Sequence, residues 1–426
     1  MKDNTIAQVV IDELCTGCGT CVSSCPEEAL ELTIDEDKGI YIPVLNKEEC
    51  HNCGICYRVC PGHSVDFKEL NIKIFGKEPD DIIIGNYLNF YVGHATEYDI
   101  RYNSSSGGLV TALLIFALEE RIIDGVLVTK MKNDNPHEPE PFIARTKEEI
   151  IEASESKYCP VPANIAVKEI LNSKEGEKFA VVGLPCHIQG IRKAEQINDK
   201  LKEKIVIHLG LFCNSFGVNF LATEYVLQKL NIRKEDVIKI NYRNGDFPPG
   251  TMSIRLKNNN SKKISHSEFW TMIFYPFVSC FAPIRCMLCS DQNCELADIS
   301  VGSEWFPYLE RDNINQSLIL VRTKPGEEIL KKCELNRKLK LIKINKMRIN
   351  DYKQKRLKAH ISIFRLLGKK TPYYNLNGLP NPTFKIYLSN VSLHVRTYFS
   401  SKRCLWGLMQ ICQSFSRKIS SVIPRK

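Results

Sequence analysis

The spacing of hydrophobic positions changes character near residue 89. From there on, short apolar runs alternate with segments in which apolar residues recur every three or four positions. The runs predict strands and the periodic segments predict helices. The expected strands are 89–95, 125–129, 179–183 and 205–212, and the expected helices are 108–120, 163–171 and 187–194. Strands alternating with helices indicate an α/β body built on a sheet.

Before residue 70 the expected elements are shorter and repeat. A short strand at 9–11, a cysteine-rich loop and a helical turn after Pro26 are followed by the same order again. Between the two copies, residues 33–43 predict a hairpin that turns at 37–39. Two copies of one unit indicate a small module with pseudo-twofold symmetry.

Eight of the 18 cysteines fall in two runs of identical spacing, each C-x2-C-x2-C-x3-C-P. This spacing is typical of bacterial ferredoxins with two [4Fe-4S] clusters, in which the fourth cysteine of each run binds the other cluster. One cluster is therefore expected on Cys15, Cys18, Cys21 and Cys60, and the other on Cys50, Cys53, Cys56 and Cys25. Glycines 17, 19 and 54 are expected to supply the positive φ angles of such tight loops.

Zinc sites and disulfide bonds both fit these cysteines less well than clusters do. Zinc sites usually pair two C-x2-C units across a longer spacer and do not need a third cysteine followed by C-P. A disulfide framework needs an oxidising compartment, and residues 1–14 lack the basic and apolar regions of a secretory signal. We therefore expect reduced thiols in a cytoplasmic protein.

Charge is divided unevenly along the chain. Residues 331–426 contain 23 Lys and Arg against two acidic residues, a net charge of +21, whereas residues 1–330 carry −12. This asymmetry favours an anionic surface for the tail, with membrane lipid or an acidic partner ahead of nucleic acid, which we do not expect as a partner. The alternative is a solvated charged extension.

Residues 393–423 mix apolar and basic side chains. They could lie peripherally on the inner face of a membrane, or equally dock on the body or on a partner. No apolar run reaches the length of about 18 residues that a membrane-spanning helix needs. These patterns together divide the chain into a two-cluster ferredoxin-type domain (1–70), a linker (71–87), two parts of the body (88–172 and 173–345) and a basic tail (346–426).

Four more cysteines, Cys186, Cys213, Cys286 and Cys289, follow predicted strands or form a tight pair. Open α/β sheets bind ligands at the carboxyl ends of their strands, so these thiols could converge on a third cubane cluster. Cys280 and Cys294 flank the pair and are alternative ligands. Buried cysteine is also a common apolar filler, and that role stays open on spacing alone.

A serine- and glycine-rich stretch, 104–108, leads directly into the predicted helix at 108–120. Serines at a helix start bond free N–H groups, and adjacent glycines let a phosphate approach the positive end of the helix dipole. A pyrophosphate would fit there. An ordinary helix cap is the alternative.

Six segments carry a resemblance to a known family. They are RYNSSSGGLVTALLIFALEERIIDGVLV, SESKYCPVPAN, VVGLPCHIQGIRK, LGLFC, CMLCSDQNCELADISVGS and LILVRTKPGEEIL. In this order, over about residues 88–345, they resemble the coenzyme F420 hydrogenase/dehydrogenase beta subunit family, here with a fused N-terminal 2x[4Fe-4S] domain. The resemblance implies an α/β flavoprotein body that binds FAD and one [4Fe-4S] cluster.

Carried over by position, the resemblance assigns the body cluster to Cys186, Cys213, Cys286 and Cys289. It also puts Ser106, Gly107, Gly108 and Thr111 near FAD phosphates, and Lys157 and Tyr158 beside the flavin. His187 stands where many relatives have Gln. The fused module and the basic tail are absent from shorter members, which leaves the electron partner and final acceptor open.

These observations predict an iron–sulfur flavoprotein oxidoreductase. It would exchange electrons between its clusters, or a ferredoxin-like redox partner protein, and a hydride-accepting substrate such as a deazaflavin coenzyme. The alternatives are a non-catalytic electron-relay subunit of a larger redox complex and a cofactor-poor scaffold. We assign no catalytic acid or base: His187, Lys157 and Asp291 are candidates for proton transfer, and each is expected to be structural.

Overall fold

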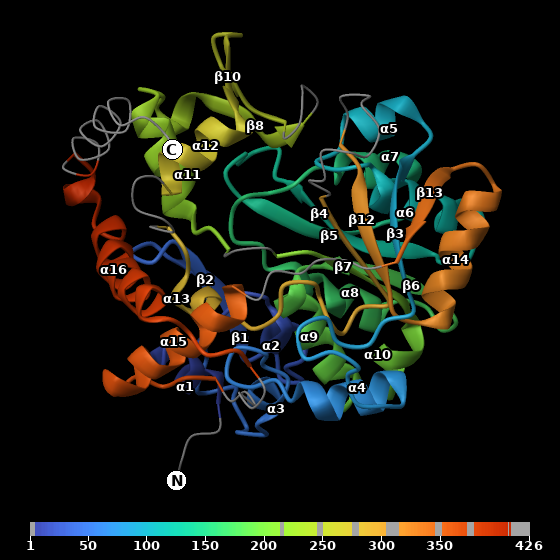
Figure 1. Cartoon of the computed structure of the whole chain (residues 1–426), viewed down its shortest axis with the longest axis horizontal. Helices are drawn as coiled ribbons and strands as arrows, with labels where there is room; N and C mark the ends of the chain where they lie inside the picture. The colour runs from blue at the N-terminus through green and yellow to red at the C-terminus, as the bar shows by residue number, and fades with distance from the viewer. Residues whose placement is uncertain are drawn as a thin grey trace.

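An eight-stranded mixed sheet runs through the body (Figure 1). The computed structural model describes residues 5–213, 217–244, 250–274, 281–303, 315–345, 352–372, 379–407 and 409. The sheet order is β13-β3-β12-β11-β7-β6-β4-β5, in which β11, β7, β6 and β4 are parallel neighbours and the outer pairs are antiparallel. The strands are β3 (Asn89–Ala95), β4 (Gly125–Met131), β5 (Pro139–Ala144), β6 (Phe179–Gly183), β7 (Ile205–Leu211), β11 (Ile299–Ser303), β12 (Ser317–Val321) and β13 (Leu339–Ile344). The predicted α/β body is confirmed.

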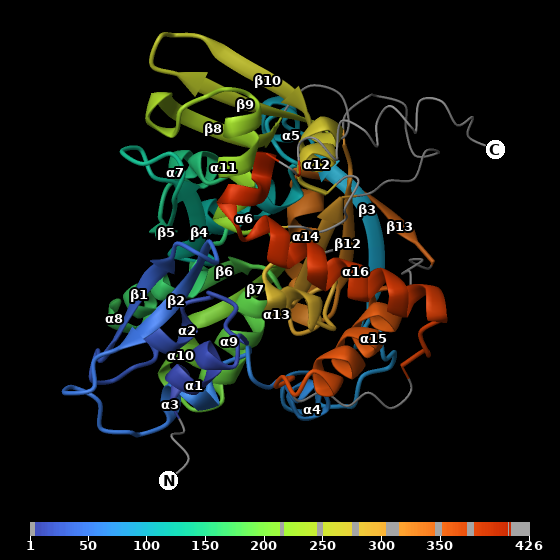
Figure 2. The same cartoon turned by 90° about the vertical axis from the view of Figure 1, so that its left-hand side faces the viewer.

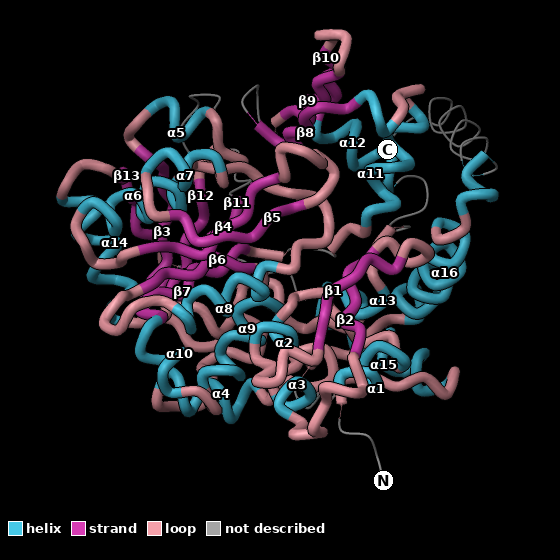
Figure 3. Tube along the Cα trace, turned by 180° about the vertical axis from the view of Figure 1, so that it is seen from behind, coloured by secondary structure: helices cyan, strands magenta, loops and turns pink. Residues whose placement is uncertain are grey.

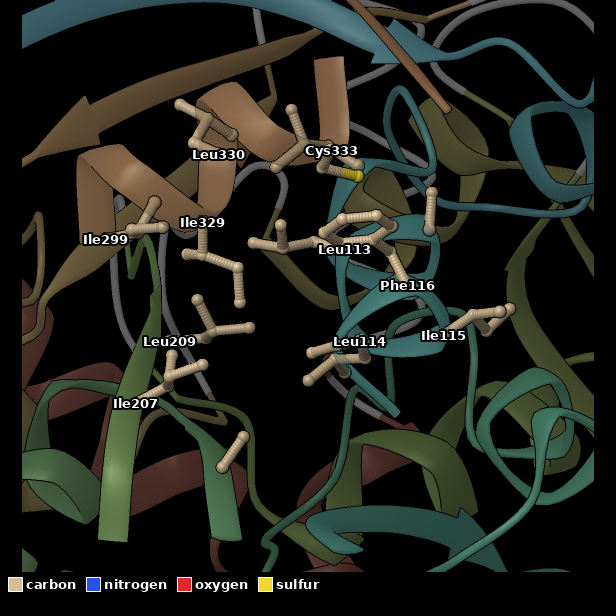
Figure 4. Packing of buried hydrophobic residues seen from close by; sticks show 14 of the residues in the cluster. Leu113, Leu114, Ile115, Phe116, Ile207, Leu209, Ile299, Ile329, Leu330 and Cys333 are labelled. Atoms are coloured by element: carbon tan, nitrogen blue, oxygen red, sulfur yellow. The ribbon is translucent and has the colours of Figure 1, made fainter. Parts of the chain in front are cut away.

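Helices cover both faces because neighbouring residues of a strand point to opposite sides. In β6, Phe179 and Val181 face one apolar cluster, and Ala180 faces the other. The first face carries α5 (Tyr98–Tyr102), α6 (Leu109–Glu119), α7 (Lys147–Glu152) and α14 (Lys324–Leu335), and side chains of α6, α14 and β7 meet in one layer (Figure 4). The second face carries η1 (Ala163–Ala166), α8 (Val167–Asn172), α9 (Pro185–Glu195) and α10 (Asp199–Lys204) (Figure 3).

The N-terminal module packs on this second face, beside and below α9 in Figure 3. Its elements are α1 (Ile6–Ile11), α2 (Thr20–Ser23), β1 (Leu30–Asp35), β2 (Ile40–Leu45), α3 (Ile55–Arg58) and α4 (Phe67–Phe75). The predicted hairpin is present as β1 and β2, paired antiparallel. Helix α4 extends into the segment expected as a linker, and Asn71 on it donates to Glu295 at 2.7 Å.

Two local predictions for the module were wrong. Residues 9–11 belong to helix α1, although their β-branched side chains favour a strand. The helix is stabilised because Ile6 and Val9 lie on one helical face and are buried together. The helical turns lie within the cysteine runs, as α2 and α3, and a non-helical turn follows Pro26. Tertiary packing therefore overrode local propensity at α1.

The pattern also gave no sign of a second, smaller sheet. Strands β8 (Val237–Asn244), β9 (Thr251–Leu256) and β10 (Ser261–Ser265) form an antiparallel sheet at the top of Figure 1. It packs with α11 (Phe220–Lys229) and α12 (His266–Phe274), and η2 (Lys234–Asp236) precedes β8. A short helix, α13 (Ile284–Met287), leads back to the main sheet.

The basic tail folds back over the N-terminal module. Its described elements are α15 (Tyr352–Leu366), α16 (Phe384–Ser400) and η3 (Arg403–Leu405). Leu357, Ile361 and Phe364 of α15 share an apolar cluster with residues of both cysteine runs. Trp406 is buried in the core of the smaller sheet. No helix in the described ranges is long and apolar enough to cross a membrane.

Candidate functional site

Each set of four cysteines expected from the two runs lines one cavity. The inner set, Cys15, Cys18, Cys21 and Cys60, lines one of them. The outer set, Cys25, Cys50, Cys53 and Cys56, lines the other. Within the described residues, no three His, Cys, Asp or Glu side chains are grouped as they would be around a single metal ion. The linings of the two cavities match the crossed grouping of the two runs, and cluster binding by these cysteines stays a prediction.

Left-handed glycines shape both loops. Gly17, Gly19 and Gly54 have φ angles of 67°, 86° and 71°, and two of them cap the helical turns α2 and α3. A side chain at Gly19 would also meet the Ile165 side chain at 2.6 Å. The loops also direct backbone N–H groups at sulfur: Gly17 donates to Cys15 Sγ at 3.4 Å. Such bonds tune the potential of a bound cluster.

The donor chemistry of the inner set fits an iron–sulfur core. Burial, followed by repulsion from neighbouring thiols, raises the pKa of Cys21 well above its usual range. Burial likewise raises the pKa of Cys60 to about 11, with Cys18 adding to the effect. Four crowded thiolates are costly here unless a cation compensates them, and metal coordination deprotonates thiols outright. The set is therefore suited to a positively charged iron core.

Two buried cations of the body hold the loop that contains Cys60. Arg285, on α13, donates to the carbonyls of Gly62 at 2.7 Å and Pro61 at 3.0 Å. Lys193, on α9, donates to the carbonyls of Cys60 and Ser64, each at 2.7 Å. The inner set is thus fixed against the body by charge-assisted hydrogen bonds.

Asn164 makes a second connection between the inner loop and the body. Its N–H donates to the carbonyl of Cys18 at 2.9 Å, and its Nδ2 donates to Thr20 Oγ1 at 2.7 Å and to the carbonyl of His187 at 2.9 Å. His187 directly follows Cys186. One buried amide therefore links the inner set to the start of α9.

The four body cysteines come together from three loops, and they are called the body set below. Cys186 lies in the first turn of α9, after β6, and Cys213 follows the neighbouring parallel strand β7. Burial raises the pKa of Cys186 well above its usual range, and the nearby Cys18, Cys286, Cys289 and Cys213 add to it in that order. The first of these neighbours belongs to the inner set, so the two sets are adjacent.

The alternative ligands have different positions. Cys294 is fully buried, and its sulfur would lie 2.5 Å from a side chain placed at Gly210, inside the apolar cluster beneath the sheet. The apolar neighbours suit a filler role, although the buried Asp291 and Arg322 and the Cys213 thiol also act on the Cys294 sulfur. Cys280 lies outside the described residues.

The serine–glycine loop is closely bonded to its surroundings. Ser106 Oγ donates to the carbonyl of Gln316 at 2.9 Å, and Gly107 N–H donates to Ser317 Oγ at 3.0 Å. Gly108, with φ 70°, caps α6 without any side-chain hydrogen bond, and Thr111 lies half-buried on its first turn. These hydrogen bonds within the protein explain the serine and glycine residues of the motif in part, without a bound ligand.

One feature of this loop and one of its neighbour Gln316, whose backbone carbonyl accepts from Ser106, suit a phosphate. The first-turn N–H groups of α6 are not capped by a side chain, and a helix N-terminus attracts anions. Gln316 Nε2 is buried without a hydrogen-bond partner among the described residues. The loop therefore fits a pyrophosphate in part.

Lys157 and Tyr158 lie on a segment that touches this loop, since Ser156 N–H donates to Ser105 Oγ at 2.7 Å. Lys157 Nζ donates to the carbonyls of Ala153, Ser154 and Glu155, and burial lowers its pKa to about 8. Tyr158 packs among aromatic rings, with Trp270 at 5.0 Å and Phe269 at 5.7 Å between ring centroids, and its hydroxyl bonds His266. Both side chains have structural partners.

The remaining candidates for proton transfer are also engaged. His187 Nδ1 accepts from Leu184 N–H, Nε2 lies 2.9 Å from the carbonyl of Val161, and burial lowers the pKa of the ring to about 4. Asp291 accepts from Gln189 at 3.0 Å and from Glu295 N–H. The side chains of His187 and Asp291 therefore both make hydrogen bonds that hold the surrounding loops in place.

Four residues of this region had not been identified from the sequence: Arg285, Lys193, Asn164 and Gln316. Arg285 adjoins Cys286 in the chain, and that neighbourhood was a usable signal. Lys193 and Gln316 gave no such signal in the sequence, because their hydrogen-bond partners lie 133 and 210 residues away.

Family comparisons agree with the three-part organisation of the site. Residues 14–64 match the 4Fe-4S dicluster domain. Residues 90–168 and 176–347 match the N-terminal and C-terminal parts of the coenzyme F420 hydrogenase/dehydrogenase beta subunit. The resemblance found in the sequence is confirmed, and so is the two-cluster character of the N-terminal module.

Relatives cover different lengths of the chain. The coenzyme F420 hydrogenase subunit beta of Methanothermobacter thermautotrophicus is 26% identical over 68% of this chain and 100% of that protein. The coenzyme F420-dependent sulfite reductase of Methanocaldococcus jannaschii is 29% identical over 88% of this chain and 54% of that protein. A chain of the F420-reducing [NiFe] hydrogenase complex from Methanosarcina barkeri shares the fold, with a TM-score of 0.52, 22% identity, and coverage of 69% of this chain and 98% of that one.

Proposed function

Because this chain belongs to the coenzyme F420 hydrogenase/dehydrogenase beta subunit family, we propose that it is an iron–sulfur flavoprotein oxidoreductase acting on a hydride-accepting substrate such as a deazaflavin coenzyme. The observation that carries the proposal is a continuous series of three cysteine sets. It starts at the surface, where Cys53 of the outer set is exposed. It ends in the body set, at the carboxyl edge of the sheet.

Adjacent sets in the series are close enough for their charges to interact. Cys56 of the outer set contributes to the raised pKa of Cys21 in the inner set, after burial and the other inner thiols. Cys18 of the inner set contributes similarly at Cys186 of the body set. [4Fe-4S] clusters held by these sets would carry single electrons along the series.

The proposed FAD site is the serine–glycine loop with the start of α6. The first-turn N–H groups after Gly108 have no side-chain cap, and the Gln316 amide has no hydrogen-bond partner among the described residues; both would hold the phosphates. Ser106, Gly107 and Thr111 would shape the loop, with Lys157 and Tyr158 on the adjoining segment. When bound, FAD supplies the exchange between hydride and single-electron chemistry.

The protein's own residues then position and enclose the cofactors. Arg285 and Lys193 fix the inner loop, and Asn164 links that loop to the start of α9. We assign no side chain as acid or base, since His187, Lys157 and Asp291 are all held by structural hydrogen bonds. We further propose that the protein works in the cytoplasm with a redox partner protein, because cluster binding needs cysteines that are not oxidised to disulfides, and the described cysteines are free.

One observation favours the alternative of a non-catalytic electron-relay subunit. Ser106 and Gly107 already bond residues of the protein itself, which weakens the case for a phosphate at those two atoms. A relay would keep the three cysteine sets and lack FAD. The two functions therefore differ in cofactor content and in turnover by the isolated chain.

Anaerobic purification with quantification of iron and released flavin separates the two functions. We expect about twelve irons, from three [4Fe-4S] clusters, and one FAD per chain. Turnover by the isolated chain is then measured with reduced deazaflavin coenzyme, reduced ferredoxin and a nicotinamide donor, each with an artificial acceptor. Flavin-free protein with full iron and no turnover would support the relay, and iron-free protein would reject both functions.

A paired substitution tests the body set. Cys286→Ala is expected to remove about four irons per chain, because it deletes a ligand of one cluster. Cys294→Ala is the matched control, since that thiol lies in an apolar cluster, and it is expected to leave the iron content unchanged. The assignment is wrong if the two variants exchange these results.

A further inference from the structure

Helix α16 has apolar side chains on two opposite faces. On the inner face, Ile386 and Leu393 are buried, and Leu393 packs against Ala282 and Met287 beside α13. The outer face carries a stripe of residues that are 50–77% exposed: Phe384, Leu388, Val391, Val395 and Tyr398. Their spacing of four, three, four and three residues places them in one line along the helix. Figure 2 shows α16 at the surface, beside α15.

This outer stripe is unusual for a helix that already packs on its own protein. A surface helix normally has one apolar face, turned to the core, and a polar face turned to water. A contiguous exposed apolar patch marks an interaction site. The stripe therefore requires a second surface to cover it.

The charge around the stripe identifies the kind of surface. Residues 352–426 contain 15 Lys and Arg and no Asp or Glu. Lys385 is exposed next to the first residue of the stripe, and Lys402 Nζ lies 5.9 Å from the ring centroid of Tyr398 at its end. Cations that flank an apolar line suit an anionic lipid headgroup layer.

A partner helix is less well supported. Helices that pair along a heptad stripe usually carry opposite charges at the flanking positions. The flanking positions here hold no acidic residue: they are Lys385, Tyr387, Ser392, His394, Phe399 and Ser401. A second copy of this helix would also bring like charges together.

We propose that the outer face of α16 lies flat on an anionic lipid surface, with its apolar stripe inserted at the headgroup boundary and its lysines at the phosphates. This arrangement does not depend on the redox function. It also revises which residues of the tail face lipid, since Leu393 and Trp406 are buried in the protein. Removal of the whole tail would strip those residues from the core, so point substitutions are the sharper test.

The test uses full-length holoprotein in a flotation assay with vesicles of phosphatidylcholine mixed with phosphatidylglycerol. A double variant, Leu388→Gln with Val395→Gln, is compared with a control, Ile82→Gln with Ile238→Gln. The control residues are exposed by 51% and 38% and lie far from α16 in the chain. We expect the double variant to lower the partition coefficient about tenfold or more, because two apolar contacts with lipid are lost, and the control to match the wild type.

Other results would overturn the proposal. It fails if wild-type protein does not bind the anionic vesicles, or binds pure phosphatidylcholine equally well. It also fails if the double variant binds like the wild type, or if the wild type is a dimer whose stripe is covered by a second copy. Iron content, measured on every variant, shows whether a loss of binding comes from misfolding.

Discussion

The inner and outer cysteine sets have the same spacing but different surroundings. Cys18, Cys21 and Cys60 of the inner set are buried, and Arg285 and Lys193 reach its loop from the body. The outer set has an exposed Cys53, and its loop meets solvent through exposed residues such as His51. Two copies of one motif thus differ in what surrounds them: the outer set faces solvent, and the inner set contacts the body.

The largest expected effect comes from deleting a ligand in each set. Cys18→Ser and Cys53→Ser should each remove about four irons. Only Cys18→Ser should also weaken the contact between module and body, because the Cys18 loop bonds Asn164. Iron analysis and thermal unfolding under anaerobic conditions measure both effects. Equal losses of thermal stability in the two variants would contradict the claim that the inner set contacts the body more closely than the outer set does.

The buried cation Lys193 should give the inner cluster a reduction potential that responds to its removal, unlike the potential of the outer cluster. Burial lowers the pKa of Lys193 to about 8, so it is mainly charged at neutral pH. Lys193→Met should lower the potential of the inner cluster by on the order of 50 mV, since a positive charge favours the reduced, more negative state.

The matched control is Lys47→Met, three residues before Cys50. Lys47 is exposed, so solvent screens its charge and the outer potential should change little. Redox titration followed by electron paramagnetic resonance measures both potentials. An equal shift in the two variants would mean that burial does not distinguish the sets.

Mild acid should loosen the tail that covers the module. Burial and neighbouring His394 lower the pKa of His360 to about 2, and burial lowers that of His394 to about 4. Both rings are neutral when packed at 3.3 Å and titrate near 6.5 when released. The packing of α15 against α16 is therefore most stable above about pH 6.5, where both histidines are neutral in either state. This stability is lost as pH falls toward 4, because the released rings take up protons that the packed rings do not.

Hydrogen exchange in α15 and α16 measures this loosening. After correction for intrinsic rates, opening should rise up to about tenfold per pH unit below 6.5 for each histidine that is released. His360→Gln should reduce the pH dependence. Protection that stays constant from pH 7 to pH 5 would rule the mechanism out.

The smallest effect concerns single hydrogen bonds at the two sets. Asn164→Ala should lower the free energy of unfolding by about 2 kcal/mol, because it leaves the buried His187 carbonyl without its donor. Glu28→Ala, which breaks an exposed ion pair with Lys168 beside the outer set, should cost less than about 1 kcal/mol. Chemical denaturation of the holoprotein compares them, and similar costs would argue against a tighter inner interface.

Several elements were predictable because their signals are local. Strand β3 has the bounds expected from its apolar run, and β6 does as well. Helix α1 was missed because its β-branched residues favour a strand until Ile6 and Val9 pack with α15. The propensity of a short segment is weak compared with burial against distant residues.

The sequence by itself determined the two cysteine runs and the family, and it predicted the crossed grouping of the cysteines, because ligand spacing and motif order are read along the chain. Only the tertiary structure decided which set is enclosed, that Arg285 and Lys193 hold it, and that α16 keeps an apolar face outside. Those features depend on contacts between residues up to 224 positions apart. The physical reason is that burial and charge environment are set by neighbours in space, whereas a motif specifies only neighbours in sequence.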